Sequence, residues 1–361
     1  MRCPVNLALQ GAGVLPGRAA CANHRKELLP RYRDRPSRRH IHPWDGKSSK
    51  AEGGGSWTLA GRRRFARWYH GAAVLTRIDH VMICVPDLAR GIDAYRRIGF
   101  DVHPGGVHAS GGTENAVAFL HDDYLELLGV RASHSHEASA GLAAFLTAGG
   151  GLRYICVQSD DLAADVAAMR TRGVDVSDPA DGGRRTPGGQ ELRWRAASLG
   201  AGNPLPIFFI EHLTPVAERR RQVPGAGEHP NGVLRLERAY VAVTDVAPEA
   251  ETYGRVLGMP VPKVVRGNVI KADMAVFEIG PTGLGVAQPA EPGPAAEALA
   301  RRGPGPFQAL YRTRSMNAAA RVMADHGLPP PARGVRNTGE QAMLVEPPDA
   351  CGVYIGFVGP A

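Results

Sequence analysis

His80-Val-Met-Ile-Cys-Val-Pro-Asp-Leu88 is followed eleven residues later by Gly99-Phe-Asp-Val, and this arrangement returns three more times along the chain. The later copies begin at Tyr154, Tyr240 and Ala309, and in each of them a glycine follows the opening run by eleven or twelve residues. A repeat with a period of roughly 70–85 residues predicts one structural unit that is used four times.

The first copy shows what this unit contains. Its opening run alternates as a strand does, with Val81 and Ile83 on one face and His80 on the other. Asp87 is a good helix N-cap, and Gly99 suits the residue just past a helix end. Three further strands are predicted around residues 100–103, 116–121 and 124–130. The unit is therefore β-α-β-β-β. In the second copy, residues 178–190 are rich in Gly, Pro and Arg and are predicted to form a long loop.

One such unit cannot close a hydrophobic core by itself, so we predict an α+β fold in which units pair. The predicted parts are a basic leader, a first domain of two units, a Pro- and Gly-rich linker and a second domain of two units: 1–73, 74–215, 216–231 and 232–361.

The net charge of +8 comes from the leader. Residues 1–73 hold 15 Lys and Arg against 4 Asp and Glu, which leaves 28 against 31 for the rest of the chain. The body therefore gives no reason to expect nucleic acid as a partner. We expect the leader to be disordered or absent from the native protein, whose true start would lie near Val74; an organelle transit peptide is the alternative.

The five cysteines show no metal-binding spacing, and Cys84 and Cys156 fall in apolar strand-like runs. Buried free thiols suit a reducing compartment, so we expect a cytoplasmic protein. No apolar run approaches the roughly 20 residues of a membrane helix, and we expect no membrane partner.

Charged residues interrupt the strand patterns of the first two units. His80 opens the first strand, and Glu126 and Glu211 lie within the closing apolar runs of units one and two. A carboxylate in such a run is costly to bury unless a cation or a strong donor meets it. Imidazole and carboxylates suit a divalent metal such as zinc, iron, manganese or nickel. The simpler alternative is a core histidine and two glutamates that are solvated or paired with arginine.

The segment Gly105-Gly-Val-His-Ala-Ser-Gly-Gly-Thr-Glu-Asn115 is a second candidate site. Its glycines allow the backbone to approach a ligand closely, and His108, Thr113 and Asn115 offer polar groups for substrate binding. An ordinary hairpin loop is the alternative, because the segment lacks the spacing of a nucleotide-binding loop.

These residues resemble the vicinal oxygen chelate superfamily and, within it, the glyoxalase-like domain proteins. The resemblance rests on residues 78–88, on His108 with Gly112-Thr-Glu-Asn115, on Tyr124-Leu-Glu-Leu127 and on Phe208-Phe-Ile-Glu211. It covers about residues 75–215 and is fainter over 233–358. It implies paired β-α-β-β-β units that build two cups of mixed sheet, in which a divalent metal chelates two neighbouring substrate oxygens.

By position, the resemblance implies His80, Glu126 and Glu211 as metal ligands, with Glu126 and Glu211 also moving protons. The fourth ligand position falls on Tyr154, a poor ligand for zinc or nickel, so Tyr154 is assigned to substrate binding. The second domain is expected to be degenerate.

Two hypotheses follow from the sequence. The first is a metal-dependent lyase or isomerase acting on a small oxygenated substrate, with an extradiol dioxygenase ranked below it because two histidines are usual there. The second is a metal-free protein that binds or sequesters a small molecule. Either would be a monomer or a homodimer.

Overall fold

The computed structural model describes residues 75–109, 112–131, 139–221, 223 and 225–361. The expectation for the leader, residues 1–73, lies outside these residues. No helix among them combines the length and the hydropathy needed to cross a membrane.

Two units of the predicted type make up the first sheet. The elements of the first are β1 (Leu75–Cys84), α2 (Leu88–Arg97), β2 (His103–His108), β3 (Thr113–Phe119) and β4 (Tyr124–Val130). The helix α3 (Ala140–Thr147) leads to the second, which holds β5 (Gly151–Ser159), α4 (Leu162–Thr171), β6 (Ala180–Arg185), β7 (Glu191–Ser198) and β8 (Ile207–His212). The short helix α5 (Val216–Arg220) follows β8.

The second sheet repeats this order. Its first unit holds β9 (Val233–Ala242), α6 (Val246–Leu257), β10 (Val265–Gly267), β11 (Ala272–Ile279) and β12 (Thr282–Pro289). After α7 (Pro294–Arg302) come β13 (Gly305–Thr313), α8 (Met316–Asp325), β14 (Ala332–Val335), β15 (Gln341–Val345), the 3-10 turn η3 (Pro347–Asp349) and β16 (Tyr354–Val358). The prediction of an α+β fold with four β-α-β-β-β units in two mixed-sheet cups is confirmed.

Each unit begins its helix with the same kind of cap. The side chains of Asp87, Asp161, Asp245 and Ser315 accept a hydrogen bond from a backbone N–H of the first helical turn. Such caps satisfy donors that the helix itself leaves free. The repeated sequence pattern is therefore a repeated local structure.

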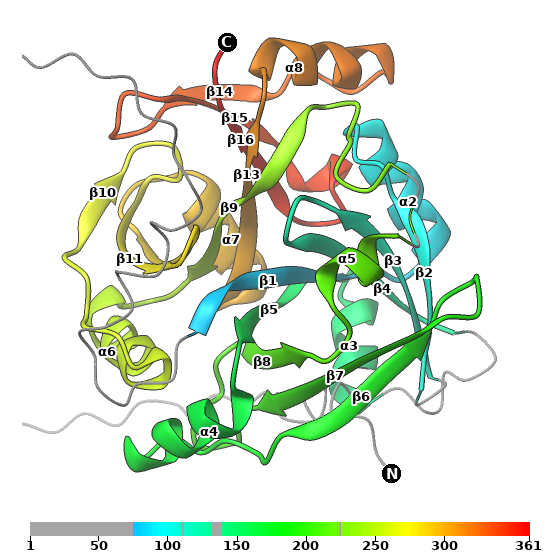
Figure 1. The fold of residues 1–361 in the computed structure, drawn as a ribbon. Coiled ribbons are helices and arrows are strands. Elements are labelled where there is room, and N and C mark those ends of the chain that lie inside the picture. The colour runs from blue at the N-terminus through cyan, green and yellow to red at the C-terminus, as the bar shows by residue number, and fades with distance from the viewer. Residues whose placement is uncertain (1–74, 110–111, 132–138, 222, 224) are drawn as a thin grey trace, which may run out of the picture. The chain divides into compact units, whose positions relative to one another are not determined.

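The two sheets differ in closure (Figure 1). The first is a closed barrel with the strand order β1-β4-β3-β2-β6-β7-β8-β5, and the second is an open sheet with the order β10-β11-β12-β9-β13-β16-β15-β14. Closure of the barrel depends on a short ladder between β2 and β6, in which Val107 pairs with Arg185 and His108 pairs with Arg184. The corresponding strands of the second sheet, β10 and β14, form its two edges.

Two local predictions are wrong. The strand expected at 100–103 lies at 103–108, and the loop expected at 178–190 contains β6. The sequence of β6, Ala-Asp-Gly-Gly-Arg-Arg, has little strand propensity, so its pairing with β2 and β7 determines its conformation. Gly182 also lets the Trp194 ring lie against this strand, because a Cβ there would be 2.3 Å from Trp194 Nε1.

A shared core joins the two sheets. The outward residues Val81 and Ile83 of β1 belong to the same buried apolar cluster as Val241 of β9 and Phe357 of β16. The described residues form one compact unit, so the division into two domains at 216–231 stays a prediction.

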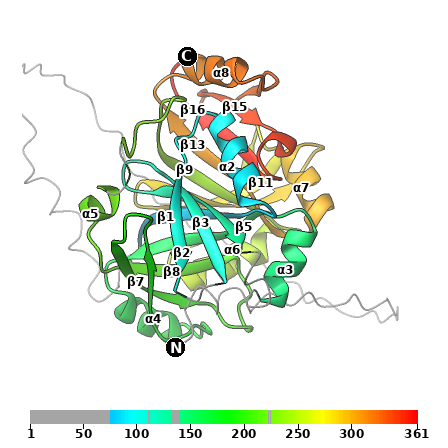
Figure 2. The same cartoon turned by 90° about the vertical axis from the view of Figure 1, so that its right-hand side faces the viewer.

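Helix ends also meet across the two sheets (Figure 2 shows α2 beside α8). Arg97, at the end of α2, donates to the carbonyls of His326 and Gly327 past the end of α8. In the same way Arg172, past the end of α4, donates to the last carbonyls of α6. Both contacts supply donors to the carbonyls that a helix C-terminus leaves free.

Asp123 is a buried carboxyl between the sheets. It is 4% exposed, and its Oδ1 accepts a hydrogen bond of 3.0 Å from the backbone N–H of Leu236 in β9. The pKa of Asp123 is raised to about 8, mainly by burial and also by the nearby Asp79 and Asp122 carboxylates, against the lowering effects of the Leu236 bond and Arg77. The carboxyl is therefore protonated in the folded protein at neutral pH.

The substitution Gly106→Ala should open the barrel. Gly106 has φ +127°, and a Cβ there would lie 2.1 Å from the carbonyl oxygen of Arg185, so β2 and β6 would have to separate. Gly189→Ala is the control. Gly189 has φ +84° with open space around its Cβ position, so this substitution costs only the backbone strain of about 1–2 kcal/mol. We expect a clearly larger loss of thermal stability for Gly106→Ala. Equal losses in the two variants would contradict this role of the β2–β6 ladder.

The substitution Asp123→Asn should change how stability depends on pH. Between about pH 4 and pH 8 the carboxyl is ionised only in the unfolded state, so the unfolding free energy of the wild type falls as pH rises through that window. Asn keeps an acceptor for Leu236 and cannot ionise. In urea titrations the variant should gain stability relative to the wild type from pH 4 to pH 8, whereas the exposed Asp93→Asn should not. Parallel pH profiles of wild type and Asp123→Asn would overturn the assignment.

Candidate functional site

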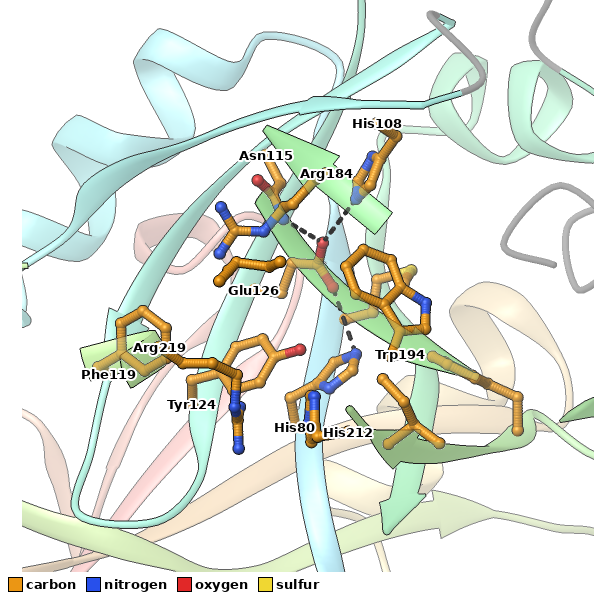
Figure 3. A pocket seen from close by; sticks show the side chains of 14 residues that line it. His80, His108, Asn115, Phe119, Tyr124, Glu126, Arg184, Trp194, His212 and Arg219 are labelled. Atoms are coloured by element: carbon orange, nitrogen blue, oxygen red, sulfur yellow. Dashed lines mark hydrogen bonds and ion pairs between the residues drawn. The ribbon is translucent and has the colours of Figure 1, made fainter. Parts of the chain in front are cut away.

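A cavity of about 40 Å³ lies inside the barrel (Figure 3). This is room for roughly three or four water-sized groups. Its walls combine apolar and aromatic side chains with histidines, a carboxylate and two arginines: His80, Met82, His108, Asn115, Phe119, Tyr124, Glu126, Arg184, Leu192, Trp194, Phe208, Ile210, His212 and Arg219.

Strand register brings His80 and Glu126 together in this cavity. β1 and β4 are parallel neighbours, with His80 opposite Tyr124 and Met82 opposite Glu126. His80 Nε2 lies 3.3 Å from Glu126 Oε2, and the imidazole stacks on the Tyr124 ring at 4.4 Å between centroids. Both side chains are almost fully buried.

Two of the predicted substrate-binding residues face the other oxygen of Glu126, and a third, Thr113, contacts one of them. Asn115 Nδ2 donates to Glu126 Oε1 at 2.6 Å, and His108 Nε2 lies 3.7 Å from the same oxygen. The other ring nitrogen of His108 is 2.8 Å from Thr113 Oγ1. Burial opposes ionisation of Glu126, but His80, His108 and Asn115 outweigh it and lower its pKa to about 2. Glu126 is therefore an anion.

Asp79 and His212 are site residues that the sequence analysis did not assign. Asp79 is completely buried; its Oδ2 lies 2.8 Å from His80 Nδ1 and its Oδ1 lies 2.9 Å from His212 Nε2. A shift in the β1–β5 register between Ile78 and His80 accompanies this arrangement. The available signals were an acidic residue next to the first candidate ligand and a histidine next to Glu211.

The hydrogen bonds of this network help to determine which of its side chains are charged. Burial opposes ionisation of Asp79, but His212 and His80 hold its pKa well below the ordinary value. Burial likewise opposes a charged His80, yet Cys156, Tyr124 and Asp79 raise its pKa well above the usual range. Burial lowers the pKa of His212 despite Asp79, so His212 is neutral at pH 7.

Tyr154 occupies the place in the second unit that His80 occupies in the first. β1 and β5 are antiparallel, with His80 opposite Cys156 and Met82 opposite Tyr154, so exchanging the two units exchanges His80 and Tyr154. Tyr154 lies in the apolar cluster that fills the barrel beside the cavity, and its ring meets Phe208 edge-on at 6.2 Å.

Glu211 is not brought to the site. In the first unit, Met82 of β1 pairs with Glu126 of β4. Its second-unit equivalent, Cys156 of β5, pairs with Phe208 of β8, so Phe208 is the counterpart of Glu126. Phe208 and His212 line the cavity, so Glu211 faces outward, where its carboxylate lies 3.9 Å from Arg195. The structure therefore does not bring Glu211 and Glu126 together. Strand alternation puts this odd-numbered residue of β8 outside the barrel.

Comparisons with known proteins agree with this geometry. Residues 78–257 match the family model described as a glyoxalase-like domain. Over these residues the chain carries a glyoxalase-like domain. No curated protein matches the sequence at a significant level.

Two solved structures share the fold of the whole described chain. A hypothetical protein from Staphylococcus aureus has a TM-score of 0.55 and 14% identity, over 78% of this chain and 99% of its own. A mutant of 4-hydroxymandelate synthase from Streptomyces coelicolor has a TM-score of 0.55 and 15% identity, over 80% of this chain and 93% of its own. At these identities the likeness concerns the fold alone.

The second sheet lacks the carboxylate of the glyoxalase-like site. The counterparts of His80 there are Arg238 and Gln308, and the counterparts of Glu126 are Gly285 and Gly356. Glycine offers no side chain to a metal.

Two sets of residues in the glyoxalase-like domain are candidates for metal binding. Among the described residues, Asp79, His80 and Cys156 form the group whose donor atoms all lie within 4.8 Å of one another. That group is already satisfied, because both oxygens of Asp79 meet histidines and burial raises the pKa of Cys156 to about 12. A protonated thiol is a poor ligand.

A second set, His80 with Glu126, fits a metal better, and His108 approaches the other oxygen of the same carboxylate. His80 Nε2 is buried and makes no hydrogen bond with any described residue, although Glu126 Oε2 is 3.3 Å away. Two ligands of one ion, each roughly 2.1 Å from it, lie about 3.3 Å apart. Asp79 on the other ring nitrogen is the partner that a metal-bound histidine usually has.

Asp79→Asn should lower the pKa of His80, because the neutral amide no longer stabilises the imidazolium. The measurement is an NMR titration of the His80 ring. Asp101→Asn is the control, since Asp101 pairs with His103 in a partly exposed site. If the His80 titration is the same in Asp79→Asn and wild type, Asp79 does not set the charge of the site.

Proposed function

We propose that this chain is a glyoxalase-like enzyme, a divalent-metal-dependent lyase or isomerase acting on a small oxygenated substrate in the barrel. The observation that carries the proposal is the buried, unpartnered Nε2 of His80, which faces the Glu126 carboxylate while Asp79 holds the opposite ring nitrogen. A buried ring nitrogen without a hydrogen bond suits a ligand that is not part of the chain, and a metal bound there would take the place of the Nε2 proton.

His80, Glu126 and His108 would hold the metal, which would polarise a substrate carbonyl. This set of two imidazoles and one carboxylate leaves coordination positions free for substrate oxygens. Asn115 orients Glu126, and Thr113 orients His108, each through the hydrogen bond described above.

Proton transfer is assigned to His212 in place of Glu211. A carboxylate with a pKa of about 2, as in Glu126, is a weak base at neutral pH. His212 is neutral, and Asp79 fixes its Nε2, which leaves Nδ1 buried without a hydrogen-bond partner among the described residues. Nδ1 would take a proton from a substrate carbon beside the polarised carbonyl and return it to the neighbouring carbon.

A metal-free binding protein is the second candidate. The aromatic residues Tyr154 and Phe208 at the second-unit ligand positions favour it, because neither completes a four-residue metal site. They would instead contact the apolar part of a bound molecule.

Metal content separates the two candidates. Full-length protein reloaded with zinc, iron, manganese or nickel should retain about one ion per chain by elemental analysis, and the double variant His80→Ala/Glu126→Gln should retain none. The control His121→Ala/Glu191→Gln alters an exposed histidine and an exposed glutamate and should bind as the wild type does. Absence of metal from the reloaded wild type would refute the enzyme proposal and favour the binding protein; retention of iron together with cleavage of a catechol would favour a dioxygenase.

A further inference from the structure

Two arginines of the barrel cavity have no role in the chemistry proposed above. Arg219 comes from α5 and Arg184 from β6, and both line the cavity (Figure 3). Arg219 is 6% exposed, and its Nε is buried without a hydrogen-bond partner among the described residues. Arg184 donates through Nη1 to the backbone carbonyl of Gly105.

Glu126 acts on the charge of Arg184 without forming an ion pair with it. Within the described part of the chain, no carboxylate lies within ion-pair distance of either guanidinium group. The two acids of the network are committed elsewhere, Asp79 to His80 and His212 and Glu126 to His80, Asn115 and His108. A buried guanidinium without a counter-ion is costly, so an anion from outside would stabilise it.

The arginines also act on each other and on the rest of the site. Burial lowers the pKa of Arg184; Tyr124 and Glu126 act in the opposite direction, and the charge of Arg219 lowers it further. Arg219 also disfavours a charged His212. The two guanidinium groups therefore add positive charge to the cavity, whose wall away from the His80–Glu126 network is largely aromatic and apolar, including Phe119, Trp194 and Ile210.

We propose that the substrate is a small carboxylate with a short apolar body, whose carboxylate binds Arg219 while Arg184 adds a second positive charge. A planar guanidinium fork matches a carboxylate in two-pronged geometry, and such charge-assisted bonds are stronger than neutral ones. This inference deepens the proposed function because it names the substrate class of the same site. It does not depend on the metal, since neither arginine is a ligand.

The position of Arg219 has its own support in the fold. The helix α5 begins after Pro215, whose carbonyl accepts from the Arg219 backbone N–H at 3.0 Å. Gln190 in the β6–β7 turn donates to Glu218 at 2.7 Å. These contacts hold α5 against the strands that carry Arg184 and Trp194.

The test compares propionate with propionamide, which has the same shape without the charge. Calorimetry on the full-length protein, both metal-free and metal-loaded, should give at least tenfold tighter binding of the acid. Arg219→Gln should remove that preference and leave amide binding unchanged. Arg195→Gln, which alters an arginine on the outer face of β7, should keep it.

A second variant shows whether a loss of binding comes from the lost interaction or from misfolding. Arg219→Lys keeps the charge and should bind the acid with intermediate affinity, with circular dichroism confirming that both variants fold. Equal affinity for acid and amide, no binding of either, or a full acid preference in folded Arg219→Gln would each overturn the proposal. Acid preference in metal-free protein that also fails to take up metal would support the carboxylate site and refute the metal-dependent enzyme, so the two proposals fail separately.

Discussion

β1 pairs with β4 along one edge and with β5 along the other, and this double pairing determines which polar groups meet inside the barrel. Parallel pairing with β4 brings His80 beside Glu126, whereas antiparallel pairing with β5 places Cys156 and Tyr154 on the other side. The shift in register next to Asp79 brings its carboxylate between two imidazoles. Burying three ionisable groups here is tolerable because each one is hydrogen-bonded or ion-paired to the next.

Closure of the first sheet also determines which polar groups meet inside the barrel. His108 and Arg184 are both site residues and both members of the short β2–β6 ladder. The open second sheet has neither this ladder nor carboxylates in the corresponding places. The closed sheet is therefore the one whose interior carries the polar network.

The repeat and the alternation in β1 and β4 allowed the fold class, His80 and Glu126 to be predicted from the sequence. Local sequence patterns predict which face of a strand a residue occupies. Glu211 was assigned to the site because its apolar run resembles the run around Glu126, but the observed pairing of β5 with β8 makes Phe208 the counterpart of Glu126 and turns His212 toward the cavity. β6 escaped prediction because long-range pairing creates it from residues with little strand propensity. Arg219 gave no signal because a short helix after the last barrel strand brings it to the cavity.

The paired helix ends bear on how such a chain arises. α2 meets α8 and α4 meets α6 through the same arginine-to-carbonyl contact, so each half of the molecule offers the other an equivalent surface, as the subunits of a two-fold symmetric dimer do. A fused duplicate carries its partner permanently at equal stoichiometry. Selection on the second copy then acts on the shared contact surface and no longer on ligand residues. Gly285 and Gly356, at the positions equivalent to Glu126, are compatible with this division of labour.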